Sequence, residues 1–315
     1  MKQYCVGVDI GGTSVKIGLF NVGGVILEKW EIPTRKENGG VEILKDVAAS
    51  IREHLSEKNI ALTEIIGVGM GVPGPVMDDG FVEVCVNLGW KHVYPARELK
   101  ALLGEEDLTV SVGNDANVAA LGEQWMGGAK GYDSSVMVTL GTGVGGGIVE
   151  HGKMISGSHG IGGEIGHITV NMNESRRCNC GNCGCLEQYA SATGVVAVAS
   201  KLLTEKDTAS FLRTFEPLTA KDVFDEAKKG DCLALEAVDI LGKYLGLTLS
   251  FVTLTVDPEV FVIGGGVSKA GPILIDTVEK YYHKFVTISE KHAGIVLAEL
   301  GNDAGICGAA RLVME

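Results

Sequence analysis

The chain has 315 residues, a length that allows two domains, each with its own buried core. It carries 27 lysines and arginines against 40 aspartates and glutamates, a formal net charge of −13. A chain this acidic has no general attraction for the phosphates of nucleic acids or for anionic lipids, so we expect neither nucleic acid nor a membrane as a partner. Glycine is the unusual residue, because its 45 copies are about twice the average share.

The sequence predicts neither a secretion signal nor a membrane span. Asp9 interrupts the first apolar run before a signal peptide could form. The longest late run without charge or proline, 244–256, is shorter than the roughly 18 to 20 apolar residues that span a bilayer. We therefore expect a cytoplasmic protein. Four of the eight cysteines fall within 178–185 and the others are dispersed among apolar residues, which favours one metal site and buried thiols over disulfides.

The first half of the chain predicts a hairpin series that leads into an α/β unit. Short β-branched runs separated by glycine turns fill the first 33 residues, and they are followed by a helix at 41–57, a strand at 65–72, a strand at 109–115 and a helix directly after it. The strand, glycine turn and strand at 6–19 then return at 136–149, an offset of 130 residues. This repeat suggests two halves of related architecture.

The second half begins with an irregular segment and then becomes helical. Residues 157–189 are rich in Gly, Cys, Asn and Glu and are too long for an ordinary connection, which is typical of a functional or metal-tied loop. The elements expected after it are helices at 220–229 and 232–255, a strand at 260–263 running into three glycines, a strand at 295–300 and a helix at 304–313. On topology alone we expect a small α/β domain of 1–117 plus 304–315, and a large α/β domain of 118–303.

Four glycine turns follow predicted strands, at 9–13, 69–74, 140–143 and 264–266. Backbone N–H groups in such turns can approach an anion with no Cβ in the way, although each turn could also be a plain hairpin. The GxGxxG pattern at 141–146 lies between two strands, so it is weak evidence for a dinucleotide site. The chain has no GxxxxGK[ST] motif, which excludes a P-loop enzyme.

Acidic and amide residues accompany two of the strand ends. Asp9 precedes Gly11 and Gly12, where a carboxylate could hold Mg²⁺ beside a bound phosphate or could cap an Asx turn. The run Asn114-Asp115-Ala116-Asn117 lies where a strand ends and a helix begins, at the edge of a sheet where ligands bind. Helix capping would explain one of these residues but does not require the whole run.

Six motifs together resemble the ROK family (repressor, open reading frame, kinase), most closely its bacterial glucokinases. They are DIGGT at 9–13, GNDANVAALGE at 113–123, LGTGVGGG at 140–147, GGEIGH at 162–167, CNCGNCGCLE at 178–187 and IGGGVS at 263–268. The resemblance implies an actin-like, ribonuclease-H-like duplicated sugar kinase fold of two α/β domains with a cleft between them. It also implies transfer of the γ-phosphoryl group of ATP to the 6-hydroxyl of D-glucose.

The resemblance further assigns roles to single residues. Asp115 would be the catalytic base, and the sugar hydroxyls would be bound by Asn114, Asp115, Glu164, His167 and Glu187, with Asn87 as a weaker candidate. ATP with Mg²⁺ would be bound by Asp9, Gly11, Gly12, Thr13, Lys16, Gly141, Thr142, Gly143, Gly264, Gly265 and Gly266, although Lys16 could equally be surface charge. Phosphoryl transfer needs positioning, charge neutralisation and one well-placed carboxylate, which this set supplies.

The cysteine cluster predicts one structural Zn²⁺ with two possible ligand sets. Spacing alone offers Cys178, Cys180, Cys183 and Cys185, a closed set of four thiolates. The family resemblance implies His167 in place of Cys183, within a zinc loop at 167–185. Zinc on one ring nitrogen of His167 would leave the other free for a sugar hydroxyl.

Other functions stay open beside a glucokinase. The motifs are shared by ROK kinases for N-acetylmannosamine, N-acetylglucosamine, mannose, allose and fructose. A sugar-sensing regulator without catalysis would be expected to lack Asp115 or the turn 11–13, and both are present. A zinc-ribbon interaction module would explain eight residues only. The family resemblance also implies a homodimer.

Overall fold

The computed structural model describes residues 2–314, which form two compact units. The first comprises Met1–Met137, Gly147–Gly163 and Glu299–Glu315, and the second Val138–Gly146 and Glu164–Ala298. The boundaries fall within strands β8 (Ser134–Leu140) and β9 (Val144–Glu150), between Gly163 and Glu164, and at the start of the final segment. The domain limits expected from the sequence, at residues 117 and 304, stay a prediction.

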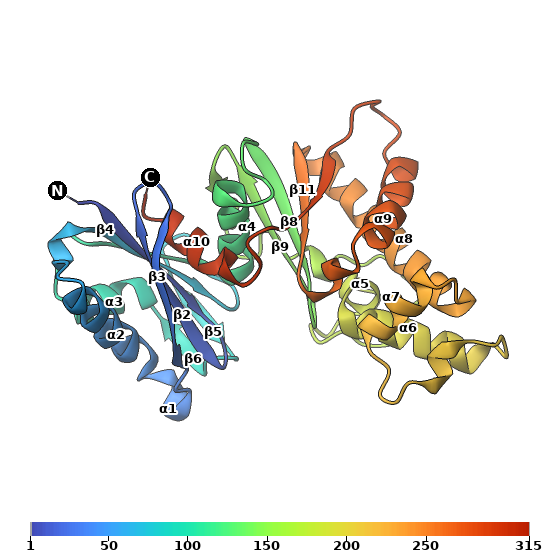
Figure 1. Cartoon of the computed structure of the whole chain (residues 1–315), viewed down its shortest axis with the longest axis horizontal. Helices are drawn as coiled ribbons and strands as arrows, with labels where there is room; N and C mark the ends of the chain where they lie inside the picture. Colours follow the sequence, from blue (N-terminus) through green and yellow to red (C-terminus); the bar gives the residue numbers. More distant parts are fainter. Residues whose placement is uncertain (1, 315) are drawn as a thin grey trace. The chain divides into compact units, whose positions relative to one another are not determined.

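The first sheet confirms the predicted hairpin series. Its strand order is β3-β2-β1-β4-β7 (Figure 1). The strands are β1 (Tyr4–Ile10), β2 (Ser14–Asn21), β3 (Ile26–Pro33), β4 (Ile65–Val72) and β7 (Thr109–Asn114). β1 to β3 are antiparallel neighbours, whereas β4 pairs in parallel with both β1 and β7. The carboxyl ends of β1, β4 and β7 therefore lie at one edge, where ligands of parallel sheets bind.

The second sheet repeats this order as β10-β9-β8-β11-β12. Its remaining strands are β10 (Lys153–Met154), β11 (Val260–Gly264) and β12 (Gly294–Leu297). The sequence repeat at an offset of 130 residues falls on the hairpins β1-β2 and β8-β9, which occupy corresponding places in the two sheets. The duplicated α/β fold expected from the sequence is thereby confirmed. A separate two-stranded ribbon contains β5 (Val82–Cys85) and β6 (Trp90–Val93).

The helices predicted from the sequence are present to within a few residues of the expected bounds. The helices of the structure are α1 (Glu37–Gly40), α2 (Ile43–Glu57), α3 (Pro95–Leu103), α4 (Asp115–Met126), α5 (Glu187–Ala190), α6 (Ala192–Glu205), α7 (Ala220–Lys228), α8 (Cys232–Val256), α9 (Pro272–Phe285) and α10 (Ala304–Arg311). Of these, α1, α3 and α5 are additional to the predicted ones. Short 3₁₀ turns include η2 (Ile165–His167) and η4 (Gly266–Ala270). α8 begins at an N-cap whose Asp231 carboxylate accepts the N–H groups of Leu233 and Ala234.

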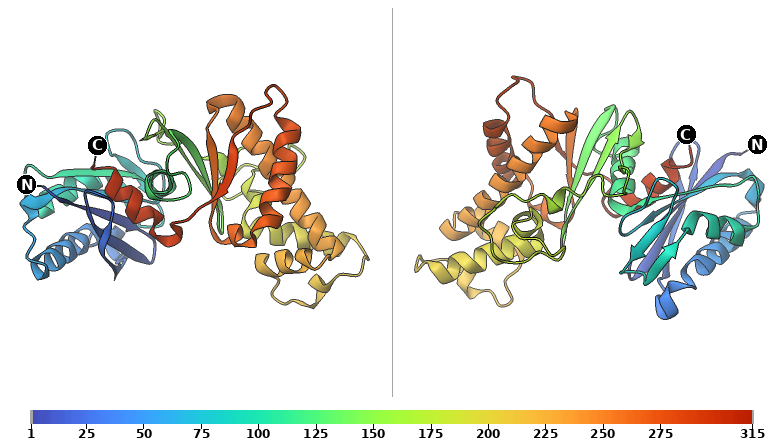
Figure 2. Two further views of the ribbon diagram at one scale, coloured as in Figure 1. Left: turned by 45° about the horizontal axis from the view of Figure 1, so that its top comes forward. Right: turned by 180° about the vertical axis from the view of Figure 1, so that it is seen from behind.

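The charge-free run 244–256 is part of α8, which by length and composition alone could cross a membrane. However, 56% of the apolar 18-residue stretch of this helix is buried inside the protein. α8 also packs along α9 (Figure 2). Asp239 on α8 also forms an ion pair with Lys280 on α9, at 2.8 Å. These features are typical of the core helix of a globular unit.

Many glycines of the first sheet make room for a helix. Along β1 the side chains of Val6 and Val8 enter the core beneath α2, whereas Gly7 faces α10. A Cβ on Gly7 would collide with the carbonyl oxygen of Ile306, and one on Gly69 of β4 with that of Ala309. α10 therefore lies almost directly on the sheet backbone, beside α4, while α2 and α3 cover the other face (Figure 1).

The fully buried Glu123 fixes the end of α4 within this layer. Its carboxylate accepts N–H groups from Gly128 at 2.9 Å, Glu299 at 3.0 Å and Leu300 at 2.9 Å. These bonds explain a wrong prediction: the strand expected at 295–300 ends at Leu297. The Ala298 N–H still donates to the carbonyl of Ile263 on β11 at 3.0 Å, but the N–H groups of Glu299 and Leu300 bind the Glu123 carboxylate and not another strand.

Candidate functional site

The predicted site residues fall into one group in each unit. The first unit holds the turn after β1, the start of α4 and the turn between β5 and β6, and the second holds the glycine turns after β8 and β11, residues Glu164 and His167, and the cysteine loop. Each group is described by itself.

Asn114 and Asp115 divide two tasks at the start of α4. The side-chain oxygen of Asn114 caps the helix by accepting the N–H groups of Ala116 and Asn117, and its amide donates to the carbonyl of Gly74 at 3.0 Å. Asp115 is the first helical residue, and one of its oxygens accepts the N–H of Ala116 at 2.8 Å. The positive end of the helix dipole favours a carboxylate at this place. Capping therefore falls mainly to Asn114, as the sequence allowed for one residue of this run.

Asp9 lies at the end of β1, on the face covered by α10. Its carboxylate packs so closely on Gly305, near the start of α10, that a Cβ there would be 2.7 Å away. Burial raises the pKa of Asp9, and the opposing charge of Lys16, its cross-strand partner, partly lowers it. Lys16 thus lies opposite Asp9 in the β1–β2 pairing, and its role as an ATP-binding residue stays a prediction.

Asp9→Asn is expected to raise the urea midpoint of unfolding at pH 7. Because the folded-state pKa of Asp9 lies above its unfolded value, ionising it costs stability. That cost is absent below the unfolded pKa, grows as the pH rises toward the folded pKa and is complete above it, and asparagine avoids it. Urea midpoints of both proteins from pH 4 to 8 should therefore diverge as the pH rises. A variant less stable than the parent at pH 7 would contradict this.

The turn after β1 shares a cavity of about 500 Å³ with residues of two other segments. The lining residues are Gly12, Thr13, Lys36, Val86, Asn87 and Gly89. The structure therefore places the predicted phosphate turn beside Asn87, the weaker of the predicted sugar-binding residues. Lys36 was not singled out from the sequence. Only its position soon after β3 could have indicated it, since β3 runs antiparallel to β2 and returns the chain to this turn.

In the second unit the turn between β8 and β9 is bound to the start of α5. The Glu187 carboxylate accepts the N–H of Val144 at 3.0 Å, and a Cβ on Gly143 would collide with that carboxylate. Glycine at 143 is therefore needed for the approach of Glu187. The carbonyl of Thr142 also accepts the hydroxyl of Thr193 at 2.8 Å. The turn predicted to bind nucleotide is thus bonded to an acidic residue predicted to bind sugar.

The glycine turn after β11 packs against the end of β8. Gly265 has a φ of +83°, and a Cβ on it would lie 2.5 Å from the carbonyl oxygen of Leu140. This contact brings the turn 264–266 next to the turn that starts at Gly141. A Cβ on Gly266 would meet no atom within 4 Å, so this glycine borders open space.

His167, Cys178, Cys180 and Cys185 form a metal-ligating group, with one ligand atom of each within 4.8 Å of all the others. The Sγ atoms of Cys180 and Cys185 are 3.7 Å apart, and His167 Nδ1 is 3.8 Å from Cys178 Sγ. Thiolates bound to zinc at about 2.3 Å in a tetrahedron lie roughly 3.8 Å apart, so the donors and their spacing fit Zn²⁺. Cys183 lies outside this group, and its Sγ is 3.7 Å from the carbonyl of Ser175.

The two ring nitrogens of His167 face different groups. Nδ1 faces the cysteines, and Nε2 is 3.9 Å from the Glu164 carboxylate. Burial raises the pKa of Cys178 and raises that of Cys185 to about 12, whereas the Asn182 N–H lowers the pKa of Cys180. A cation among them would offset the cost of holding buried thiolates.

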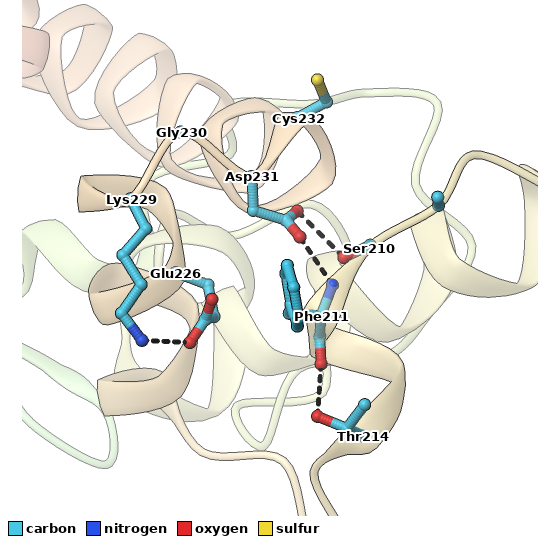
Figure 3. Close-up of a pocket in the computed structure, with 9 residues that line it drawn as sticks. Ser210, Phe211, Thr214, Glu226, Lys229, Gly230, Asp231 and Cys232 are labelled. Atoms are coloured by element: carbon cyan, nitrogen blue, oxygen red, sulfur yellow. Dashed lines mark hydrogen bonds and ion pairs between the residues drawn. The ribbon is translucent and has the colours of Figure 1, made fainter.

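A further cavity of about 630 Å³ lies between the segment before α7 and the start of α8 (Figure 3). Its polar groups bind one another. The Asp231 carboxylate accepts the Ser210 hydroxyl and the Phe211 N–H, and Lys229 forms an ion pair with Glu226 at 2.7 Å. None of the residues predicted to act in catalysis or binding lines this cavity.

Comparison with known proteins decides the family. The model of the ROK family matches residues 5–315. The chain belongs to the ROK family. A glucokinase from Halalkalibacterium halodurans is 42% identical over 99% of this chain and 96% of its own length, and one from Thermotoga maritima is 37% identical over 100% and 98%.

A solved ROK structure supports the same placement. The Streptomyces griseus ROK glucokinase, in complex with glucose and AMPPNP, is 31% identical and matches with a TM-score of 0.74 over 98% of both chains. The mixed α/β ROK sugar-kinase fold expected from the sequence is therefore confirmed, as is the family resemblance.

Proposed function

We propose that this ROK protein is an ATP-dependent glucokinase that phosphorylates D-glucose on its 6-hydroxyl. The near full-length similarity to glucokinases of two organisms carries this proposal. The neutral, polyhydroxylated substrate agrees with a site of carboxylates, an amide and an imidazole, which are acceptors and donors for hydroxyl groups.

In this proposal Asp115 accepts the proton of the sugar 6-hydroxyl as that oxygen attacks the γ-phosphorus of ATP. The P–O bond to ADP breaks as the new P–O bond forms, and the hydroxyl proton passes to the carboxylate. Asn114 holds the first turn of α4 by its cap and thereby fixes Asp115. One N–H of its amide remains to contact the sugar.

Glu164, His167 and Glu187 are proposed to bind further hydroxyls of the same glucose. Zn²⁺ on Nδ1 of His167 would fix the tautomer of the ring, so that Nε2 carries the proton and donates to the sugar. These four residues would fill the coordination of a zinc ion held there and leave no open position for activating water, so the zinc would be structural.

The glycine turns at 11–13, 141–143 and 264–266, with Asp9 and Lys16, are proposed to bind ATP. Backbone N–H groups of such turns suit phosphate oxygens. Mg²⁺ bound with ATP would neutralise charge on the phosphates, and Asp9 is the acidic residue beside the first turn.

The test is the rate of ADP release with glucose, mannose, fructose, allose, N-acetylglucosamine and N-acetylmannosamine. We expect the highest kcat/KM for glucose, by roughly tenfold or more, because hydroxyl-binding groups left unpaired by another sugar weaken its transition state. The position of the phosphate on the product is read by NMR. A higher kcat/KM for an acetamido sugar would assign the chain to another ROK kinase activity, and turnover of no hexose would favour the sugar-sensing regulator.

Two further expectations rest on the family. We propose the cytoplasm as the compartment, since ATP is available there, and a homodimer as the assembly.

A further inference from the structure

We propose that Lys36 binds the phosphoryl group during its transfer to the sugar and holds it in the glucose 6-phosphate product. The inference rests on the proposed kinase activity and adds a residue to its site. Lys36 is the only charged residue among the six that line the cavity at the first glycine turn, and the other five are Gly12, Thr13, Val86, Asn87 and Gly89. A cavity with a single cationic residue, otherwise lined by neutral ones, favours an anion.

The backbone next to Lys36 is bonded to the predicted phosphate turn. The N–H of Thr34 donates to the carbonyl of Thr13 at 3.0 Å, and the Thr34 hydroxyl donates to the carbonyl of Gly11 at 2.7 Å. Both ends of that turn are therefore fixed to a residue two positions before Lys36. The backbone of Lys36 is accordingly held close to the N–H groups proposed to bind phosphate.

The other side of Lys36 is fixed to the ribbon that carries Asn87. Asn38, Gly39 and Gly40 have φ values of +54°, +78° and +71°, a left-handed run that turns the chain sharply. The run is held by the indole of Trp90, which donates to the carbonyl of Gly40 at 3.2 Å. Lys36 is thereby positioned between the turn proposed to bind phosphate and Asn87, a residue proposed to bind sugar.

The charge of Lys36 is available for a ligand, in contrast to that of its neighbour. Arg35 is bound through two nitrogens by Asp46 and lies 3.6 Å from Glu42. Over residues 2–314 the ion pairs include none that involves Lys36, and its side chain is exposed. Arg35 therefore provides a matched control: an adjacent, exposed cation whose charge is already neutralised.

The experiment compares Lys36→Ala, Lys36→Arg and Arg35→Ala with the parent enzyme. Calorimetric titration with glucose 6-phosphate should show about 10- to 100-fold weaker binding to Lys36→Ala, the loss expected for one charge-assisted hydrogen bond. Binding of glucose should change less than about twofold, since the uncharged sugar lacks the anion. kcat/KM for MgATP at saturating glucose should fall by a similar 10- to 100-fold. Lys36→Arg should recover most of both losses, and Arg35→Ala should match the parent.

Each outcome decides between the proposals. Equal affinities of Lys36→Ala and Arg35→Ala for glucose 6-phosphate would overturn the inference even if the parent is an active glucokinase. Equal losses of affinity for glucose and glucose 6-phosphate in Lys36→Ala would show that Lys36 has a structural role, and they would overturn the inference too. If the parent enzyme turns over no hexose, the proposed function fails, while a selective loss of glucose 6-phosphate binding in Lys36→Ala would still assign the anion to this lysine.

Discussion

Asp115→Asn is expected to lower kcat for glucose by about 10² to 10⁴, the usual contribution of a general base. Asparagine has nearly the same size and keeps an oxygen that can accept the Ala116 N–H, but it cannot take the proton of the sugar hydroxyl. The helix should remain intact, because Asn114 supplies most of the cap and Asn at 115 keeps the side-chain oxygen. KM for glucose should change little, since ground-state binding uses other residues as well.

A matched control is Asp276→Asn, the same change at an exposed residue of α9. Its kcat and urea midpoint should equal those of the parent. Asp115→Asn should have the same urea midpoint of unfolding as the parent and should differ from it in kcat alone. Near-parental kcat in Asp115→Asn would remove Asp115 from the role of base and leave phosphoryl transfer to positioning and charge neutralisation.

The strands and hairpins could be predicted because their causes are local. The alternation along β1 and the glycine turn before β2 lie within a few residues, and the same pattern at 136–149 revealed the second hairpin. The equivalence of the two sheets then followed from the repeat. The two parallel strands at the far edge of each sheet depend on crossovers, whose pairing no local pattern specifies.

The abundance of glycine had a cause that the sequence could not show. Glycine turns for phosphates explained part of it, but Gly7 and Gly69 serve a different purpose. They let α10, which lies more than 230 residues later in the chain, rest on the sheet backbone. A contact between such distant segments cannot be predicted from the local sequence of either one. The need for glycine at these positions is therefore seen only once the fold is known.

Of the candidate site residues, too, the sequence could indicate only some. Ordered motifs singled out Asp115, His167 and Glu187 as candidates, because each lies in a short run with a characteristic spacing. Lys36 lies in no such run and reaches the first glycine turn only through the pairing of Thr34 with it. The dependence of Gly143 on Glu187 likewise joins two motifs 44 positions apart.

The zinc ligands provide the second large expected effect. Parent enzyme should bind one Zn²⁺ per chain, and Cys183→Ala should bind the same amount with near-parental kcat/KM, because Cys183 Sγ faces the Ser175 carbonyl and lies outside the ligand group. Cys185→Ala and His167→Ala should lose zinc or bind it far more weakly, since a structural zinc site needs all four ligands. Metal content after dialysis is the readout, together with thermal unfolding.

Glucose affinity separates the two roles of His167. Cys185→Ala keeps the imidazole but removes the metal that fixes it, so KM for glucose should rise, by roughly 10- to 100-fold on the scale of lost positioning contacts. His167→Ala removes both the ligand and the donor at Nε2, so its KM should rise at least as much, and excess zinc should not restore it. Full zinc in His167→Ala with zinc loss in Cys183→Ala would establish four thiolates as ligands. In that case His167 would bind sugar without the metal, and the short distance of Nδ1 from Cys178 Sγ would be packing alone.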